Sequence, residues 1–474
     1  MDVLQILEEY LGNFVNWVNS FLWDFLLLIL LCGTGIYFTV RLKFVQVIRF
    51  WKSLCEMFKK CRFNGEKAGA GGMSSFQSFT TAVAAQIGTG NLAGAATAIV
   101  MGGPGAIFWM WLSAFFGMAT IFAEATLAQK FKKEQNGKIT GGPVYYIQAA
   151  FRGRFGRVLA GIFAVLIIIA LGFMGNMVQS NSISAAFESL LGTPENGTLV
   201  KLITGVVLAA VAGFVFLGGV KRIAAFTEKI VPLMALLYIG GCVVVLAFHW
   251  DRIGSAFWMI FRGAFQPQAV LGGAVGFGIK EAIRYGVARG LFSNEAGMGS
   301  TPHAHALAKV KHPCEQGSIA MISVFLDTFV VLTLTALVII TSGLFDNGLD
   351  GIELTQAAFS QVFGGFGGIF IAVCLLFFAF STIVGWYFFG EQNIRYLFGE
   401  KAVKIYAALV VCFIVLGSLL KVELVWSMAD MFNGLMVIPN LLGVLALSGI
   451  VSKLYADFGS RSEKKQKKTK EKSC

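Results

Sequence analysis

The sequence predicts an all-α integral membrane protein of about eleven transmembrane helices, in which one N-terminal helix precedes two sets of five. The 474-residue chain is 56% hydrophobic and 14% charged, whereas a typical soluble domain is about 25% charged. Its apolar residues gather in stretches of about 20 or more, the length at which a helix crosses a bilayer. Glycines interrupt the first stretch of each set, and matching interruptions in two halves are typical of an inverted repeat.

The predicted spans divide the chain into four parts. Residues 1–72 hold the N-terminal helix and a basic loop, 73–250 the first five-helix repeat, 251–452 the second repeat, and 453–474 a basic tail. Because five is an odd number, the second set enters the membrane from the side opposite to the first. The predicted spans are 21–40, 73–100, 105–129, 157–187, 200–219, 229–248, 269–299, 317–342, 357–389, 402–420 and 424–451.

The charges of the connecting loops predict the orientation. The net charge of +12 comes mainly from Lys and Arg in loops 41–67 and 130–157 and in the tail. Loops 188–198 and 343–356 carry acidic residues and no basic ones. Since basic loops mark the cytoplasmic face, we expect an external N-terminus and a cytoplasmic C-terminus. The lysine-rich tail is expected to be a disordered, solvated segment beside anionic lipid, without a role in nucleic-acid binding.

The first predicted span of the first repeat is interrupted at its centre by QIGTGN, residues 86–91. Glycine is a poor helix former, and in a bilayer every freed backbone group needs another partner. An unwound turn presents carbonyl oxygens to a cation, while the positive N-terminal end of the next half-helix faces a carboxylate. The second repeat has a similar candidate in GGAVGFG, residues 272–278. The pair predicts a binding site near the middle of the membrane.

Two other interpretations of the first interruption have to be weighed. Residues 88–93 fit the dinucleotide pattern GxGxxA, but the flanking apolar helix, in place of a strand, excludes that fold. Gly90 and Gly94 form a GxxxG pair that would serve close helix packing. The polar side chains of Gln86, Thr89 and Asn91 in the same turn favour binding over packing alone.

The ninth predicted span carries adjacent hydroxyls, Ser381 and Thr382, with Trp386 one turn further on the same face. Hydroxyl oxygens are ligands that a hard cation such as Na⁺ accepts. Ser and Thr in membrane helices also commonly bond to their own backbone carbonyls. The pair taken alone therefore fits both a structural and a functional role.

Ionisable residues inside predicted spans are functional candidates by default. Glu124 and Asp327 lie deepest, as hydrogen-bond hubs or as proton sites. For Arg284, Arg289 and Glu391 we expect internal pairing or extension to the membrane surface. His303 and His305 have no third ligand beside them, so no metal site is expected there. No known catalytic motif occurs, and we expect no enzyme activity and no organic cofactor.

Long motifs of this chain resemble the alanine/glycine:cation symporter family. They are GTGNLAGAATAIVMGGPGAIFWMW from residue 88, GNMVQSNSI at 175–183, YGVARGLFSNEAGMGS at 285–300 and FSTIVGWYFFGEQNIRYLFG at 380–399. The resemblance covers essentially the whole chain. It implies the five-plus-five fold of the sodium-coupled leucine transporter, in a bacterial inner membrane. It also implies Na⁺-driven uptake of a small neutral amino acid, with alanine or glycine as the usual substrate.

The resemblance implies a site at the first interruption. The substrate carboxylate would lie on the amides of Thr89 and Gly90, and its ammonium group on carbonyls near Ala85 and Gln86. The implied substrate-binding residues are Ala85, Gln86, Gly88, Thr89, Gly90, Asn91, Phe277, Thr382 and Trp386. The implied Na⁺ ligands are the backbone carbonyls of Ala84, Ile87 and Phe378 and the hydroxyls of Ser381 and Thr382.

The chain departs from the expected family pattern near this site. Gln86 stands where a smaller residue is expected, and Lys280 and Glu281 follow GFGI where an apolar run is usual. These departures leave open a more polar substrate such as serine or glutamine. Proton coupling through Asp327 or Glu124 is the alternative to Na⁺. A channel is disfavoured, because interrupted helices around one central site differ from a continuous polar pore.

Overall fold

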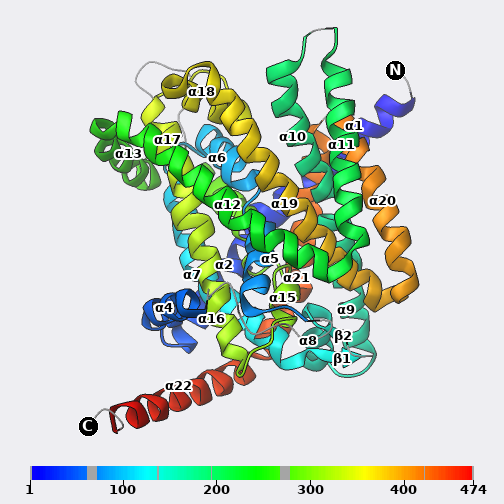
Figure 1. The fold of residues 1–474 in the computed structure, drawn as a ribbon, viewed down its shortest axis with the longest axis vertical. Coiled ribbons are helices and arrows are strands. Elements are labelled where there is room, and N and C mark those ends of the chain that lie inside the picture. Colours follow the sequence, from blue (N-terminus) through cyan, green and yellow to red (C-terminus); the bar gives the residue numbers. More distant parts are fainter. Residues whose placement is uncertain are drawn as a thin grey trace.

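The computed structural model describes residues 3–60, 72–135, 138–193, 195–266, 278–420 and 422–471, and most of them are helical (Figure 1). In this part of the chain, nine helical segments are long and apolar enough to cross a membrane. A tenth span consists of two helices, Ser75–Gln86 and Gly90–Gly102, that meet at an angle of 49°. The prediction of an all-α membrane protein is confirmed, and the seventh of the eleven predicted spans, 269–299, lies partly outside the described residues.

The first span is longer than predicted and covers Tyr10–Arg41. It is built from α1 (Val3–Phe21), the π-helical η1 (Leu22–Leu26) and α2 (Leu27–Arg41). The short helices α3 (Val45–Ile48) and α4 (Phe50–Lys60) follow it.

The first repeat begins with α5 (Ser75–Gln86), whose start is fixed by reciprocal hydrogen bonds between Ser74 and Gln77, each 3.1 Å long. After the bend come η2 (Gly90–Gly94) and α6 (Ala95–Gly102). The remaining spans are α7 (Ala106–Phe131), the continuous α9 (Arg154–Ile167), η3 (Ile168–Gly175) and α10 (Asn176–Leu191), then α11 (Gly197–Leu217) and α12 (Gly219–Phe248). Between α7 and α9 lie a small hairpin, β1 (Lys133–Gln135) with β2 (Lys138–Thr140), and α8 (Pro143–Ala150).

The second repeat follows η4 (Trp250–Arg252) and α13 (Ile253–Phe265). Its elements are α14 (Ile279–Asn294), α15 (Pro302–Ala306), the continuous α16 (Pro313–Val324), η5 (Phe325–Leu332) and α17 (Thr333–Ser342), then α18 (Gly351–Phe363), α19 (Gly365–Phe398), α20 (Glu400–Leu419) and α21 (Val422–Ala446).

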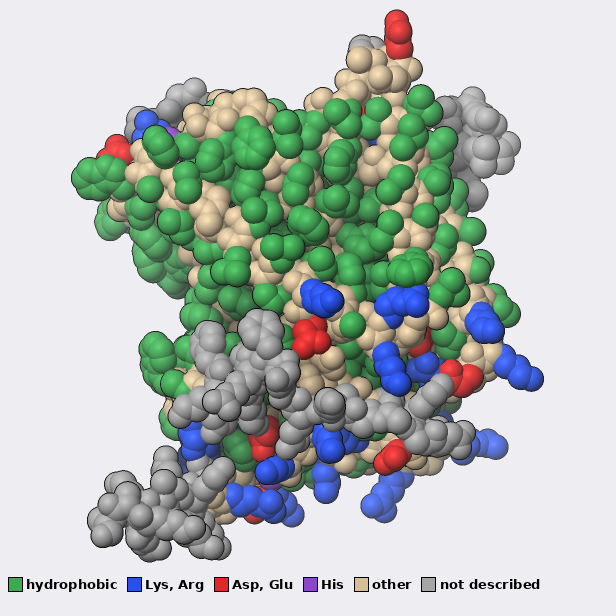
Figure 2. All heavy atoms as spheres, in the orientation of Figure 1, with side chains coloured by type: hydrophobic (Ala, Val, Ile, Leu, Met, Phe, Trp, Pro, Cys, Tyr) green, Lys and Arg blue, Asp and Glu red, His purple; other side chains and the backbone are tan. Residues whose placement is uncertain are grey.

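Helix α19 lies at the centre of the molecule. In its most apolar stretch 78% of the residues are buried, against 33% in α11 and α20. A helix that is apolar on every side and buried belongs to the core, whereas α11 and α20 leave apolar side chains exposed. Figure 2 shows a broad hydrophobic surface on one face of the molecule, and Lys and Arg side chains gathered towards the end where α8 and α22 lie. This distribution fits a protein that spans a membrane with one basic side.

The expectation of a disordered tail is wrong, because α22 runs from Ser448 to Glu471. Its first part is held against the loop before α16: His312 Nε2 lies 3.3 Å from Asp457 Oδ2, and the His312 ring stacks on Phe458. Burial lowers the pKa of His312, although the neighbouring Asp457 carboxylate acts in the opposite direction. Tertiary contacts at its start explain why this polar segment is helical there.

Candidate functional site

The first interruption comprises residues 87–89, between α5 and η2. Helix α5 ends at Gln86, and Ile87 is extended with ψ of 92°. The N–H of Gly88 donates to Asn91 Oδ1 at 3.1 Å, and the N–H of Thr89 donates to Gln179 Oε1 at 3.3 Å. In an unbroken helix these two N–H groups would donate to the carbonyls of residues 84 and 85. The interruption therefore frees those carbonyls inside the membrane.

An oxygen cluster forms where the freed Ala84 carbonyl and the Ile87 carbonyl face α19. Thr382 Oγ1 lies 2.9 Å from the carbonyl oxygen of Ala84, 3.1 Å from that of Phe378 and 3.4 Å from that of Ile87. Ser381 Oγ lies 2.8 Å from the Phe378 oxygen and 3.4 Å from the Ala84 oxygen. We call these three carbonyl and two hydroxyl oxygens the oxygen cluster. These oxygens come from uncharged groups and lie close together, and such a group suits a hard cation.

Two glycines allow α5 and α19 to approach this closely. A Cβ atom at Gly88 would lie 2.5 Å from Thr382 Oγ1, and one at Gly385 would lie 2.9 Å from the Cβ of Ala85. Neither distance is compatible with a side chain unless the helices move apart. Glycine at these two positions is therefore a condition for the oxygen cluster.

The packing interpretation holds for one glycine of the GxxxG pair. A Cβ atom at Gly90 would lie 3.1 Å from Ser293 Cα on α14, so Gly90 permits a close helix contact. At Gly94 the nearest atom would be the Thr89 oxygen, 4.0 Å away. Substitution of Gly90 would consequently disturb packing against α14 as well as any ligand.

The described interruption of the second repeat lies at residues 295–301, between α14 and α15, and we call it the second interruption. Glu295, Gly297 and Gly299 have φ values of 56°, 90° and 80° there, which no helix permits. The sequence prediction placed this break at GGAVGFG, of which only Gly278 is described. Phe277 also lies outside the described residues. Gln86, the last residue before the first interruption, donates from Nε2 to the backbone oxygen of Asn294, the last residue before the second, at 2.7 Å. The two interruptions therefore lie side by side.

Asp327 joins the two interrupted helices. Its buried carboxylate accepts hydrogen bonds from Asn91 Nδ2 at 2.8 Å, from Ser293 Oγ at 3.0 and 3.1 Å, and from Thr328 Oγ1 at 2.8 Å. Asn294 Nδ2 in turn donates to Thr328 Oγ1 at 3.2 Å. Asp327 is thus at least a hydrogen-bond hub, and all three of these donors are electrically neutral.

Two further carboxylates accept hydrogen bonds at the second interruption. Glu124 accepts from the N–H of Gly297 at 2.9 Å and from Asn440 Nδ2 at 2.5 Å. Glu295 accepts from the indole of Trp386, at 2.5 Å, and from Ser300 Oγ. Trp386 is therefore buried against the second interruption. The structure adds Gln179, Ser293, Asn294 and Glu295 to the predicted site residues; the polar run SNEAG within an apolar stretch was the available signal for three of them.

Two buried polar atoms beside the first interruption make no hydrogen bond within the described structure. They are Gln86 Oε1 and Thr89 Oγ1. A buried polar atom left without a partner costs about 1–3 kcal/mol. Both atoms belong to predicted substrate-binding residues, and a polar ligand at the interruption would relieve this cost.

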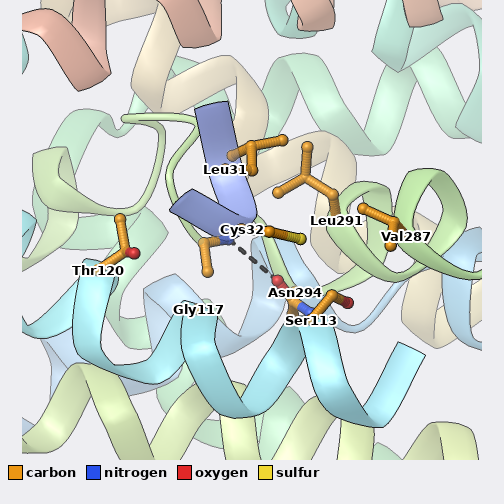
Figure 3. Close-up of a pocket in the computed structure, with 9 residues that line it drawn as sticks. Leu31, Cys32, Ser113, Gly117, Thr120, Val287, Leu291 and Asn294 are labelled. Carbon is orange, nitrogen blue, oxygen red and sulfur yellow. Dashed lines mark hydrogen bonds between the residues drawn. The ribbon is translucent and has the colours of Figure 1, made fainter. Parts of the chain in front are cut away.

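A small cavity lies beside the second interruption, between α2, α7 and α14 (Figure 3). Its volume is about 20 Å³, which is enough for one water molecule but not for an amino acid. Asn294 Oδ1, on its wall, accepts a hydrogen bond of 3.1 Å from the N–H of Ala296. The lining residues are Leu31, Cys32, Ser113, Gly117, Thr120, Val287, Leu291, Asn294 and Ala296.

The remaining ionisable candidates lie away from the oxygen cluster. The pairing expected for three of them is confirmed: Arg284 with Asp24 at 2.7 Å, Arg289 with Asp430 at 3.2 Å, and Glu391 with Arg395 at 2.5 Å. Lys280 and Glu281 are exposed at the start of α14, about 20 Å along the helix from the second interruption. Their expected closeness to the pocket is wrong.

The histidine pair has structural partners. His303 Nε2 contacts Asn393 Nδ2 at 2.9 Å, and His305 Nδ1 contacts Gln316 Oε1 at 2.9 Å. Within the ranges given above, no three His, Cys, Asp or Glu side chains are grouped as metal ligands.

Comparison with known sequences decides the family. The profile of the sodium:alanine symporter family matches residues 8–473. The chain belongs to this family. Among symporter-family relatives, it is 44% identical to "Sodium/alanine symporter AgcS" of Methanococcus maripaludis, over 93% of this chain and 95% of that protein. It is 42% identical to "Probable sodium/glutamine symporter GlnT" of Bacillus subtilis, over 95% of this chain and 91% of the relative.

A solved structure supports the fold of this symporter-family chain. The crystal structure of MhsT in complex with L-phenylalanine superposes with a TM-score of 0.55 and covers 82% of this chain and 98% of that one. The sequence identity is 15%, so the likeness concerns the fold alone. The predicted leucine-transporter-like fold is confirmed. The family match and the apolar helices show a multi-pass membrane protein of an amino-acid symporter family.

Proposed function

We propose that this protein is a Na⁺-coupled symporter that imports a small neutral amino acid, alanine or glycine first, by alternating access. The oxygen cluster carries the proposal. It gathers five uncharged oxygens from α5, the first interruption and α19 without adding a buried charge, which is a suitable environment for Na⁺ in a membrane. Movement of one positive charge through 100 mV provides about 2.3 kcal/mol, before the Na⁺ gradient itself is counted.

The substrate would lie between the two interruptions. Its carboxylate would take the amides of Thr89 and Gly90 at the start of η2, where the helix dipole is positive. Its ammonium group would take the carbonyls near Ala85 and Gln86. The unpaired Gln86 Oε1 and Thr89 Oγ1 support a polar ligand here. The same two atoms keep serine and glutamine among the candidate substrates.

Uptake of radiolabelled alanine into proteoliposomes tests the proposal. We expect uptake to require Na⁺ in the external buffer and to fall at least tenfold when K⁺ replaces Na⁺ at constant pH. Unlabelled glycine should compete, whereas amino acids that lack a free carboxylate or a free amine should not. Uptake that is indifferent to Na⁺, or strongest competition by an amino acid with a charged side chain, would contradict the proposal.

Proton coupling through Asp327 or Glu124 is the second candidate. The observation that favours it is a pair of fully buried carboxylates, of which Asp327 has the neutral donors Asn91, Ser293 and Thr328 around it. Protonation of the carboxylate would remove the cost of burying its charge, just as pairing with a cation would. The same assay separates the two mechanisms, because a proton-coupled protein would follow a pH gradient in the absence of Na⁺.

The proposed location is a bacterial inner membrane, with the N-terminus outside and the C-terminus in the cytoplasm. In a variant with all native cysteines replaced, Asp346→Cys should react with an impermeant maleimide in intact cells, and Arg154→Cys only after permeabilisation. Both side chains are exposed, so access depends on the side of the membrane. Asp346 lies in the acidic loop and Arg154 in a basic one. Labelling of position 154 in intact cells would reverse the orientation.

A further inference from the structure

The side chain of Glu295 crosses from the second interruption to α19. It is fully buried, its Oε1 accepts a hydrogen bond of 2.5 Å from Trp386 Nε1, and its Oε2 accepts one from Ser300 Oγ. Trp386 lies one helical turn beyond Thr382, which belongs to the oxygen cluster. One hydrogen bond therefore links the second interruption to the turn of α19 that follows the cluster.

The backbone at Glu295 indicates that this side chain has a specific task. Its φ of 56° is in the left-handed region, where glycine is favoured and a glutamate costs conformational free energy. The other two left-handed residues of the interruption, Gly297 and Gly299, are glycines. Strain of this kind persists only when the surrounding contacts maintain it, and at functional sites it is often part of the mechanism. Here the backbone is held by hydrogen bonds from the Glu295 N–H to the Leu291 oxygen and from the Met298 N–H to the Glu295 oxygen, and the two carboxylate contacts add to these.

The Trp386 ring that receives this contact has little freedom to move. A Cβ atom at Gly175 would lie 2.6 Å from the ring, so α19 and η3 are in close contact there. Phe292, on α14, packs edge-on against the ring with centroids 5.9 Å apart. Gly385 precedes Trp386 in α19, and a Cβ atom there would lie 2.9 Å from the Cβ of Ala85, so α19 and α5 are also in close contact. A shift of Glu295 would consequently be transmitted to α19 and to its contact with α5.

We propose that Glu295 is a positioning residue for coupling: through Trp386 it holds the second interruption against α19 in the conformation that assembles the oxygen cluster. Na⁺ binding and closure of the second repeat around substrate then favour the same conformation, so each strengthens the other. This role rests on the proposed Na⁺-coupled transport. Glu295 contributes no atom to the oxygen cluster.

The test compares Glu295→Ala, Trp386→Phe and the double variant in the proteoliposome assay. Each single variant should raise the Na⁺ concentration for half-maximal uptake about tenfold, because the hydrogen bond between the two buried side chains is lost. The double variant should be no worse than Glu295→Ala, since both changes remove one contact and their effects are not additive. Glu295→Gln retains a carbonyl acceptor for the indole and should stay within about threefold of wild type.

Ser300→Ala provides the matched control, because it removes the other hydrogen bond of the same carboxylate and leaves the Trp386 contact in place. Its Na⁺ curve should stay within about twofold of wild type. A second measurement is the rise in unfolding temperature of the purified protein when Na⁺ is added, which the two single variants should reduce. A merely structural role would lower the unfolding temperature equally with and without Na⁺.

The outcomes are separable. If wild type responds to Na⁺ but Glu295→Ala and Trp386→Phe alter neither the Na⁺ curve nor the Na⁺-induced rise in unfolding temperature, the positioning role is wrong and the proposed function stands. Additive effects in the double variant would also overturn the role. If uptake and unfolding temperature of the wild type both ignore Na⁺, the proposed function fails first, and the coupling role fails with it.

Discussion

Replacing Thr382 with alanine is expected to raise the Na⁺ concentration for half-maximal uptake by about 5- to 150-fold. Thr382 Oγ1 is the member of the oxygen cluster that faces all three carbonyls, those of Ala84, Phe378 and Ile87. Loss of one buried polar partner costs about 1–3 kcal/mol, which corresponds to this range. Because Na⁺ and substrate binding are linked, apparent substrate affinity should fall at low Na⁺ and recover at high Na⁺.

Thr382→Ser is the matched control for that change, since it removes only the methyl group and keeps the oxygen. Its Na⁺ curve should lie close to that of wild type. The measurement is initial uptake rate against Na⁺ concentration, with the amount of reconstituted protein determined for each variant. An unchanged Na⁺ curve in Thr382→Ala would show that the cation binds elsewhere.

Gly88→Ala should abolish most Na⁺-dependent uptake. The new Cβ atom would lie 2.5 Å from Thr382 Oγ1 and 3.3 Å from Gln179 Oε1. It would press on a proposed Na⁺ ligand and on the side chain that accepts the Thr89 N–H. Overpacking of a buried position costs about 1–3 kcal/mol, and here the strain falls on the oxygen cluster itself. We expect protein to be produced and inserted, with uptake reduced at least tenfold at physiological Na⁺.

The same substitution six residues later, at Gly94, gives the comparison. At Gly94 the nearest atom to a new Cβ would be 4.0 Å away, so Gly94→Ala meets no obstacle. Alanine is also a better helix former than glycine, by about 0.5–1 kcal/mol. Gly94→Ala should retain uptake and be slightly more stable to heat. Equal losses in both variants would mean that general helix stability, rather than the oxygen cluster, limits transport.

The spans and the first interruption could be predicted from the sequence because both depend on local properties. A run of about 20 apolar residues crosses a bilayer whatever its neighbours are, and glycines among polar residues interrupt a helix in place. The proposed Na⁺ ligands were different: spacing alone did not connect Ala84 with Ser381 and Thr382, and the family resemblance provided that link. The predicted disorder of the tail was wrong for a related reason, since His312 and Phe458, which hold α22, are far apart in the chain.

The sequence by itself determined that the chain is a multi-pass α-helical membrane protein with an interrupted helix at residues 86–91, and the structure narrows the interruption to 87–89. The tertiary structure decided what that turn faces. The Thr382 hydroxyl reaches the Ala84 carbonyl across 298 residues, and Gln86 reaches Asn294 across 208. The tertiary structure also decided that the described interruption of the second repeat lies at 295–301. Glu124 accepts a hydrogen bond there from another helix, and Glu295 is an acceptor within the segment itself. These contacts depend on how the helices pack in space. Residues so far apart in the chain form no local sequence pattern that would predict their contact.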